Sequence, residues 1–479
     1  MVFNSLTFLI FISSFLPAYF LLRGRMRMWL CLISSYIFYG WWDWRFLFLV
    51  LFTTTLDYTL GVLIEGTDDA KNKRRLLIVS VFANLGFLGF FKYFNFFIDS
   101  FASLAKIVGV EPHWHTLHIL LPIGISFYTF QSMSYTIDVY RKEIKPERDF
   151  FRFAAFVSLF PQLVAGPIVR ARDFLPQFRE DKKFSWARFQ EGTAQILWGF
   201  FKKVAIADSI APFVDQVFNT PESFGSLHLL IGVFFYSFQI YCDFSGYSNI
   251  ACGLAHIMGF DFPWNFRTPY FSKNFSEFWT RWHISLSSWL RDYLYIALGG
   301  NRGRKWFTYR NLILTMIIGG LWHGANWAFV FWGFLHGSYL VIQRLTGPAL
   351  GRLENAIKMP KFMQNGFDIL IVYIFTCFAW IFFRAGAAPD SFGISWKIIH
   401  GIISLEGFSW DAVINKFQVI QGLVSIGILL FAEVVHQRIN LQHLSVSNPI
   451  FRVASFAILF WLIEFLGTFD SNSFIYFQF

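Results

Sequence analysis

Charged residues are scarce in this chain of 479 residues, making up only 15% of it, whereas 55% of the residues are hydrophobic. Soluble domains contain about 25% charged residues, so the composition excludes an ordinary soluble enzyme. Stretches of roughly 18–25 apolar residues recur, and the mean hydropathy is +0.47. The sequence therefore predicts an all-α polytopic membrane protein.

Cysteine is equally rare. The four residues, Cys31, Cys242, Cys252 and Cys377, lie in apolar contexts, and none belongs to a CxxC pair. This pattern argues against a disulfide framework and against a cysteine-ligated metal. No other spacing suggests metal ligands, so we expect neither a metal nor a bound cofactor.

Acidic residues are outnumbered, 30 against 40 lysines and arginines, which gives a net charge of +10. The basic residues cluster in short loops between apolar runs, as the positive-inside rule describes. We therefore expect membrane lipids and no nucleic acid as a partner. Because no repeat, linker or soluble segment interrupts the pattern, we predict one transmembrane domain over residues 1–479.

The alternation of basic and neutral loops predicts about 11–13 spans and an extracytoplasmic N-terminus. The first run, Leu6–Leu22, is followed by arginines and is predicted to be a retained span. Glu111–Thr116 is predicted to be an outside loop. Phe150–Val164 is short and has basic residues on both sides, which predicts a re-entrant segment. Later spans are expected near Gly192–Val214, Leu227–Asp243, Tyr309–Leu321, Asn326–Ile342, Phe367–Phe383, Val413–Glu433 and Phe451–Leu466.

The region from residue 244 to 310 is too polar for a simple span. Asn274 followed by Glu277 resembles a capping box and predicts the start of an amphipathic interfacial helix. Aromatic residues then fall near one face of that helix, namely Phe278, Trp282, Trp289 and Tyr293.

His323 lies in the middle of the apolar stretch Leu312–Leu340. An ionisable group at membrane depth is a functional-site candidate, and histidine suits general-base chemistry. Neighbouring glycines, such as Gly320 and Gly324, would let two helices approach closely. The alternative is a histidine that only hydrogen-bonds between helices.

Two further histidines and an aspartate are weaker candidates. His283 precedes His323 by forty residues and could reach the same site if its helix folds into the bundle; otherwise it is an ordinary interfacial histidine. His336 lies about 20 Å beyond His323 along a straight helix, so we predict a structural role for it. Asp243 stands where a span meets the polar region and could line the site or cap a helix.

The loop Gly299–Lys305 is rich in glycine and basic residues. Backbone amides together with Arg302 and Arg304 suit phosphate groups, although the Walker spacing is missing. A positive-inside anchor is the alternative interpretation.

The block EFWTRWHISLSSWLRDYLY at Glu277–Tyr295, followed by Gly299–Arg302 and by Gly320–Gly324, strongly resembles the membrane-bound O-acyltransferase (MBOAT) family. Within this family it is similar to the AlgI-like branch of alginate O-acetylation proteins. The resemblance covers essentially the whole chain, including Tyr39–Phe46, Pro161–Pro167, Asp243–Ser248 and Phe474–Phe477.

This resemblance implies a ring of tilted helices around a central tunnel and a catalytic core at about 150–345. It makes His323 the catalytic histidine and His283 the second site residue. It also implies acetyl-CoA or another thioester as co-substrate, extracytoplasmic acetyltransferase partner proteins, and a bacterial inner-membrane location. Residues expected to contact substrate are Trp279, Trp282, Trp322, Asn326, Asp243, Arg302 and Arg304.

Other functions remain open at this point. Peptidoglycan O-acetylation and teichoic acid D-alanylation would use the same kind of site. A transporter or flippase of a polysaccharide export complex, or a structural membrane subunit, would transfer no acyl group.

Overall fold

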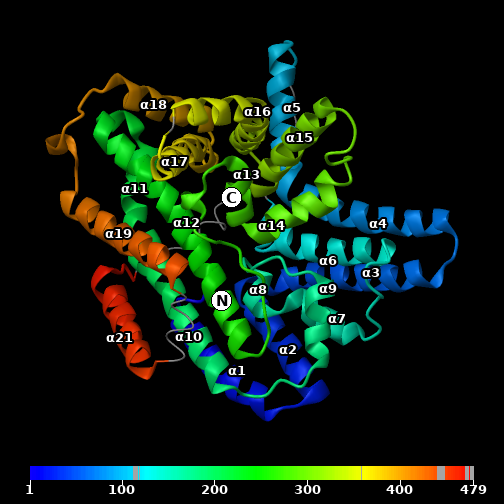
Figure 1. Cartoon of the computed structure of the whole chain (residues 1–479). Helices are drawn as coiled ribbons and strands as arrows, with labels where there is room; N and C mark the ends of the chain where they lie inside the picture. The colour runs from blue at the N-terminus through cyan, green and yellow to red at the C-terminus, as the bar shows by residue number, and fades with distance from the viewer. Residues whose placement is uncertain (112–116, 118, 358, 440–447, 470–473, 475–479) are drawn as a thin grey trace. The chain divides into compact units, whose positions relative to one another are not determined.

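The computed structural model describes all residues except 112–116, 118, 358, 440–447, 470–473 and 475–479 (Figure 1). Residues 112–116 of the predicted outside loop and 475–477 of the C-terminal motif therefore lie outside the described residues. The described residues form helices and no β-strand, which confirms the all-α class. Six segments are long and apolar enough to span a membrane: Gly24–Gly66, Ala70–Ile107, Ser226–Ile257, Lys361–Ala385, Lys416–Gln437 and Pro449–Leu466. The chain is thus a multi-pass membrane protein.

The chain folds into two compact units. Unit 1 comprises residues 1–196 and 250–263, and unit 2 comprises residues 197–249 and 264–479. The helices of unit 1 are α1 (Leu6–Leu21), α2 (Gly24–Asp43), α3 (Leu47–Gly66), α4 (Ala70–Leu88), α5 (Phe94–Ile107), α6 (Ile125–Tyr140), α7 (Phe150–Ser158), α8 (Phe160–Leu163) and α9 (Ala171–Phe174). Helices α10 (Trp186–Phe200) and α12 (Ser226–Ile257) each contribute residues to both units.

A buried carboxylate joins three helices of unit 1. Asp57 of α3 accepts hydrogen bonds from Ser80 (2.5 Å) and Asn84 (2.9 Å) of α4. It also accepts from Ser132 (2.5 Å) and Thr136 (3.0 Å) of α6. Because each carboxylate oxygen has two donors, this polar group holds the helices together without a counter-ion.

The segment predicted to be re-entrant consists of two short buried helices, α7 and α8. Leu159 separates them with a non-helical backbone, φ −54° and ψ 119°. Asp149 caps the start of α7 by accepting from the backbone N–H groups of Phe151 and Arg152. Irregular backbone at this point is enclosed by protein, as expected for such a segment.

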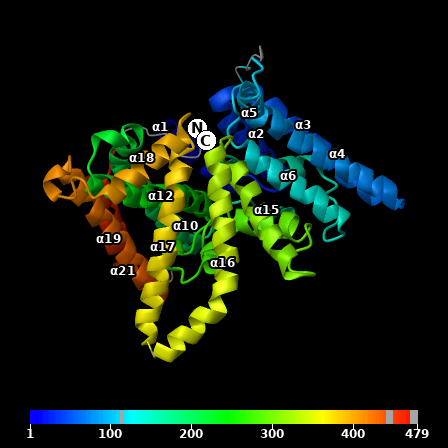
Figure 2. The same ribbon diagram turned by 90° about the horizontal axis from the view of Figure 1, so that it is seen from above.

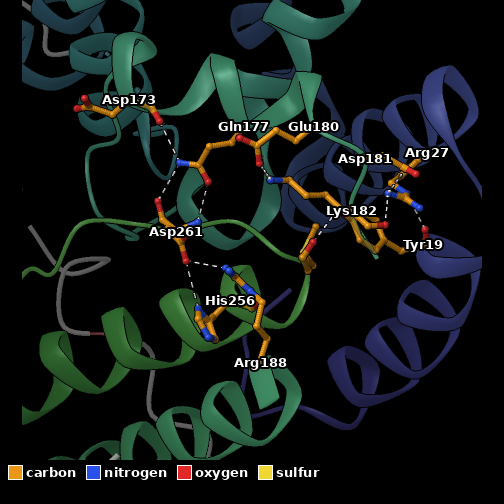
Figure 3. Close-up of polar contacts among 11 residues, drawn as sticks. Tyr19, Arg27, Asp173, Gln177, Glu180, Asp181, Lys182, Arg188, His256 and Asp261 are labelled. Carbon is orange, nitrogen blue, oxygen red and sulfur yellow. Dashed lines mark hydrogen bonds and ion pairs between the residues drawn. The ribbon is translucent and has the colours of Figure 1, made fainter. Parts of the chain in front are cut away.

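The basic stretch that follows, residues 170–188, is held by polar contacts to other parts of unit 1 (Figure 3). Arg27 of α2 donates to the carbonyl of Lys182 (2.6 Å) and pairs with Asp181 (3.4 Å). Asp261 pairs with Arg188 (2.6 Å) and contacts His256 (3.3 Å). These contacts fix the stretch to residues far away in the sequence.

Four of the predicted later spans, Leu227–Asp243, Phe367–Phe383, Val413–Glu433 and Phe451–Leu466, overlap unit 2 segments that are long and apolar enough to cross a membrane. Tyr309–Leu321 and Asn326–Ile342 are helical but are not among those segments, and Gly192–Val214 is divided between the two units. Its helices are α11 (Ser209–Asn219), α13 (Phe275–Arg281), α14 (Ile284–Trp289), α15 (Lys305–His323), α16 (Trp327–Ile357), α17 (Lys361–Ala385), α18 (Ser391–Ser404), α19 (Lys416–Arg438) and α21 (Pro449–Leu466). Helices α15 and α16 lie side by side (Figure 2). A Cβ on Gly320 would stand 2.1 Å from the Phe329 carbonyl oxygen, and one on Gly333 would stand 2.2 Å from that of Met316. The glycines therefore permit the close approach of the α15 and α16 backbones that was predicted from the sequence.

The predicted amphipathic helix is only partly correct. Asn274 caps α13 by accepting from the backbone N–H of Glu277 (2.8 Å), and Glu277 accepts from Lys273 N–H (2.8 Å). The prediction of a single continuous helix is wrong, however, because the helix is interrupted at Trp282 and His283, between α13 and α14.

Candidate active site

His323 is the last residue of α15, and its side chain is 4% exposed. The helix ends there because Gly324 takes an extended conformation, φ −161°. A Cβ on Gly324 would stand 2.1 Å from the Phe329 ring, so only glycine fits. Asn326 then caps α16 by accepting from Ala328 N–H (2.9 Å). The sharp reversal of the chain places His323 at the tip of the helix pair.

His283 occupies the break between α13 and α14, with a left-handed backbone, φ 42° and ψ 54°. Non-glycine residues rarely adopt this conformation, and the surroundings hold it in place. Ile284 N–H donates to the Asn265 carbonyl (2.9 Å), and the Ser285 hydroxyl donates to the Asn265 side chain (2.6 Å). The break turns the imidazole inward, where it is 1% exposed.

The imidazole of His283 is enclosed by aromatic side chains, and it lies outside the six segments that could span a membrane. Phe244 packs edge-to-face against it, with ring centroids 4.6 Å apart. Burial lowers the pKa of His283 to about 3, because desolvation disfavours the charged imidazolium. The ring is therefore neutral at physiological pH and can either donate or accept a hydrogen bond.

The two histidines meet in one site within unit 2. Their ring centroids are 6.4 Å apart, and Trp322 packs against both, at 6.0 Å from His283 and 5.0 Å from His323. Trp332 (5.2 Å) and Phe383 (5.1 Å) pack on the remaining sides of His323. A shell of aromatic rings therefore surrounds the two imidazoles and shields them from bulk water. Each imidazole can accept or donate a proton.

The two other predicted tryptophans lie close to this shell. Trp282 is 1% exposed and packs against Trp380, with ring centroids 5.0 Å apart. Trp279 packs against Trp332 at 5.8 Å. Trp279 thus packs directly on a ring that contacts His323, whereas Trp282 reaches such a ring through Trp380, which packs on Phe383 at 5.1 Å. The roles of both as substrate contacts stay predictions.

Asn326 and Asp243 are engaged in bonds within the fold. Besides capping α16, Asn326 accepts from the Ser391 hydroxyl (3.0 Å). Asp243 forms an ion pair with Lys203 (2.6 Å), which also pairs with Asp208 (2.8 Å). These contacts give both residues a structural task, and direct substrate contact by them stays a prediction.

The basic loop Gly299–Lys305 is exposed and shaped by its own hydrogen bonds. Asn311 of α15 donates to the Gly300 carbonyl (3.0 Å), and Tyr295 donates to the Asn301 side chain (2.5 Å). Within the described part of the chain, Arg302 and Arg304 form no ion pair. Their charges are therefore available to an anionic ligand.

Comparisons with known proteins agree with this architecture. The family model of the membrane-bound O-acyltransferases matches residues 141–387, which include both histidines. The chain belongs to the membrane-bound O-acyltransferase family. It is therefore an O-acyltransferase of the MBOAT type, as the sequence motifs predicted.

Curated MBOAT relatives cover most of the chain. The probable alginate O-acetylase AlgI of Azotobacter vinelandii is 44% identical over 91% of this chain and 84% of its own length. The peptidoglycan O-acetyltransferase of Helicobacter pylori is 37% identical over 84% of this chain and 80% of its own length. The teichoic acid D-alanyltransferase of Bacillus subtilis is 27% identical over 57% of this chain and 71% of its own length.

The surroundings of the MBOAT site include two residues that the sequence prediction did not place there, although the structural role predicted for His336 stays a prediction. His336 was expected to lie far from His323, but that prediction assumed one straight helix. The reversal at Gly324–Asn326 folds α16 back along α15, so His336 packs on Trp332 (4.8 Å), which packs on His323 (5.2 Å). Phe383 comes from α17 and carries no local signal in the sequence.

Proposed function

We propose that this MBOAT protein O-acetylates an exported cell-surface polysaccharide of the alginate type. The observation that carries the proposal is the pairing of His323 with His283 inside one aromatic shell. Similarity to alginate O-acetylases over most of the chain supports the choice of acetyl group and glycan. The peptidoglycan O-acetyltransferase relative makes peptidoglycan the second candidate acceptor.

The chemistry needs a base and stabilisation of an oxyanion. His323 takes the proton from an acceptor hydroxyl, whose oxygen attacks the carbonyl carbon of an acetyl thioester. His283 donates a hydrogen bond to the oxyanion that develops on the carbonyl oxygen. The C–S bond then breaks, and the leaving thiolate takes up the proton from His323. An ester and a free thiol result.

The donor is proposed to be cytoplasmic acetyl-CoA, used as a co-substrate. Its phosphates suit Arg302 and Arg304, which are exposed and carry no ion pair in the described residues. The protein would lie in the bacterial inner membrane with its N-terminus outside. Where the first acceptor hydroxyl belongs to an extracytoplasmic acetyltransferase partner protein, that partner would then pass the acetyl group to the glycan.

The test is the acetyl content of the exported polysaccharide in cells that carry His323→Ala. We expect a loss of at least about 100-fold, because a general base of this kind contributes 10²–10⁴ to the rate. His283→Ala should also lower the acetyl content. His400→Ala, on exposed α18, is the matched control and should leave it unchanged.

All variants must be present in the membrane in equal amounts, measured by immunoblot. Normal acetylation by His323→Ala would overturn the assignment, as would transport of a carrier without acetyl transfer. Ester analysis of both the exported glycan and peptidoglycan distinguishes the two acceptors.

A further inference from the structure

Helix α16 carries a row of buried side chains with polar atoms. Trp332, His336 and Tyr339 recur at spacings of four and three residues, so they share one face of the helix. They are 1%, 0% and 7% exposed. Trp279 of α13 packs against this face, 5.8 Å from Trp332 and 5.1 Å from His336. We call these four residues the α16 polar cluster.

The polar atoms of this cluster lack hydrogen-bond partners. Neither ring nitrogen of His336 has one among the described residues. The same holds there for the indole N–H groups of Trp279 and Trp332 and for the Tyr339 hydroxyl. Buried polar groups that serve only the fold are normally satisfied, as Asp57 is with its four donors. A concentration of unsatisfied groups is expected where a ligand supplies the missing partners.

The cluster adjoins the site at one end. Trp332 contacts both His323 and His336, so a single ring separates the proposed base from the cluster. Further along the same helix, Arg344 donates to Asn301 of the basic loop (3.3 Å). Helix α16 thus runs from the reacting centre to the exposed loop where the donor's phosphates are proposed to bind.

We infer that the α16 polar cluster binds the secondary amide next to the thioester of a pantetheine-type donor. This inference rests on the proposed function. In such donors, two methylene groups separate the sulfur from an amide N–H, which a carbonyl follows. With the thioester carbonyl at His323, the amide lies about one ring's width away, at Trp332 and His336.

The chemistry of the amide complements the cluster. A neutral imidazole offers one acceptor nitrogen and one N–H donor. The acceptor nitrogen of His336 takes the amide N–H, and the indole N–H of Trp332 donates to the amide carbonyl. The surrounding rings, Phe278 among them at 5.9 Å from His336, exclude water and strengthen both bonds. Free coenzyme A and a carrier-bound pantetheine arm share this amide.

The experiment uses the full chain in proteoliposomes and two small donors that differ by one atom. S-acetyl-N-acetylcysteamine contains the amide, and its ester analogue has oxygen in place of the amide N–H. The wild type should use the amide about tenfold more efficiently, measured as kcat/KM for acetyl transfer, because one hydrogen bond is lost with the ester. His336→Phe should abolish this preference, and His336→Gln, which keeps an acceptor, should retain part of it.

His228→Phe is the matched control, since His228 is also fully buried between aromatic rings of unit 2 but lies outside the cluster. It should keep the wild-type preference. His336→Phe should also lower kcat/KM for the natural donor. The natural donor is whichever of acetyl-CoA and an acetylated carrier protein the wild type uses.

A wild type that uses both small donors equally well would overturn the inference, and this result needs no folded variant. An unchanged preference in His336→Phe would overturn it too. A wild type that accepts acetyl from no thioester would instead refute the proposed function.

Discussion

Two basic segments of this protein differ in what their charges contact. In unit 1, most arginines between Arg141 and Arg188 lie within 4.0 Å of a carboxylate of the same unit, among them Arg148 with Glu65 and Arg188 with Asp261. In unit 2, the described residues offer no carboxylate partner to Arg302 or Arg304. We call these regions the paired segment and the basic loop.

The paired segment is organised around Glu147, which is 3% exposed. Arg152 (3.1 Å) and Arg179 (3.0 Å) each contact one of its carboxylate oxygens. The backbone N–H groups of Arg148 and Asp149 donate to the same side chain. Figure 3 shows a second set of contacts, in which Asp261 holds Arg188. Positive charge here fixes the fold and leaves little for a ligand.

The basic loop has the opposite arrangement, because polar side chains fix its backbone and leave its charges outward. Asn311 and Tyr295 fix the loop by donating hydrogen bonds to Gly300 and Asn301. Gly299 and Gly303 have φ values of 109° and 95°, which other residues rarely adopt. Positive charge in a segment therefore does not by itself predict an anion-binding function, because the contacts of each guanidinium determine whether its charge is available.

Removing the carboxylate at the centre of the paired segment should have the largest effect. We expect Glu147→Gln to destabilise the protein by about 2 kcal/mol, because it removes a buried acceptor charge, leaves Arg179 without its ion-pair partner and leaves Arg152 with only Asp149, at 3.8 Å. The measurement is the midpoint of thermal unfolding in detergent. Glu143→Gln is the control: Glu143 is 39% exposed beside Arg172, so its loss should change stability by less than about 0.5 kcal/mol. Equal effects of the two variants would contradict the comparison.

Neutralising the basic loop should instead affect the donor. We expect the double variant Arg302→Gln, Arg304→Gln to raise the KM for acetyl-CoA about tenfold, because two phosphate contacts are lost while the unfolding midpoint stays unchanged. The control removes the same charge from the paired segment, with Arg141→Gln and Arg172→Gln. A rise in KM of the same size in this control would show that net charge, and not the loop, attracts the donor.

Much of this architecture could be predicted from local signals. Apolar runs located four of the later spans, and Asn274 with Glu277 marked the start of α13. His323 stood out because an ionisable group is rare in an apolar run. These features depend on residues close together in the sequence.

The rest depends on how distant segments meet. The left-handed backbone at His283 is held by Asn265, eighteen residues earlier, and no local pattern announces it. The partner of Asp243 is Lys203, which belongs to another helix. The reversal at Gly324 brings His336 against Trp332, which contacts His323. The sequence does not announce this reversal, because a glycine alone does not fix the direction of a turn.

Ionic strength gives the finest distinction between the two basic regions. Raising the salt concentration from about 0.05 to 0.3 M should raise the wild-type KM for acetyl-CoA roughly threefold, because exposed charges such as Arg302 are screened. The double variant of the basic loop should show no such rise. Contacts at Glu147 are buried and therefore screened less, so the unfolding midpoint should change little over the same range. A midpoint that falls while KM stays constant would reverse the assignment of the two regions.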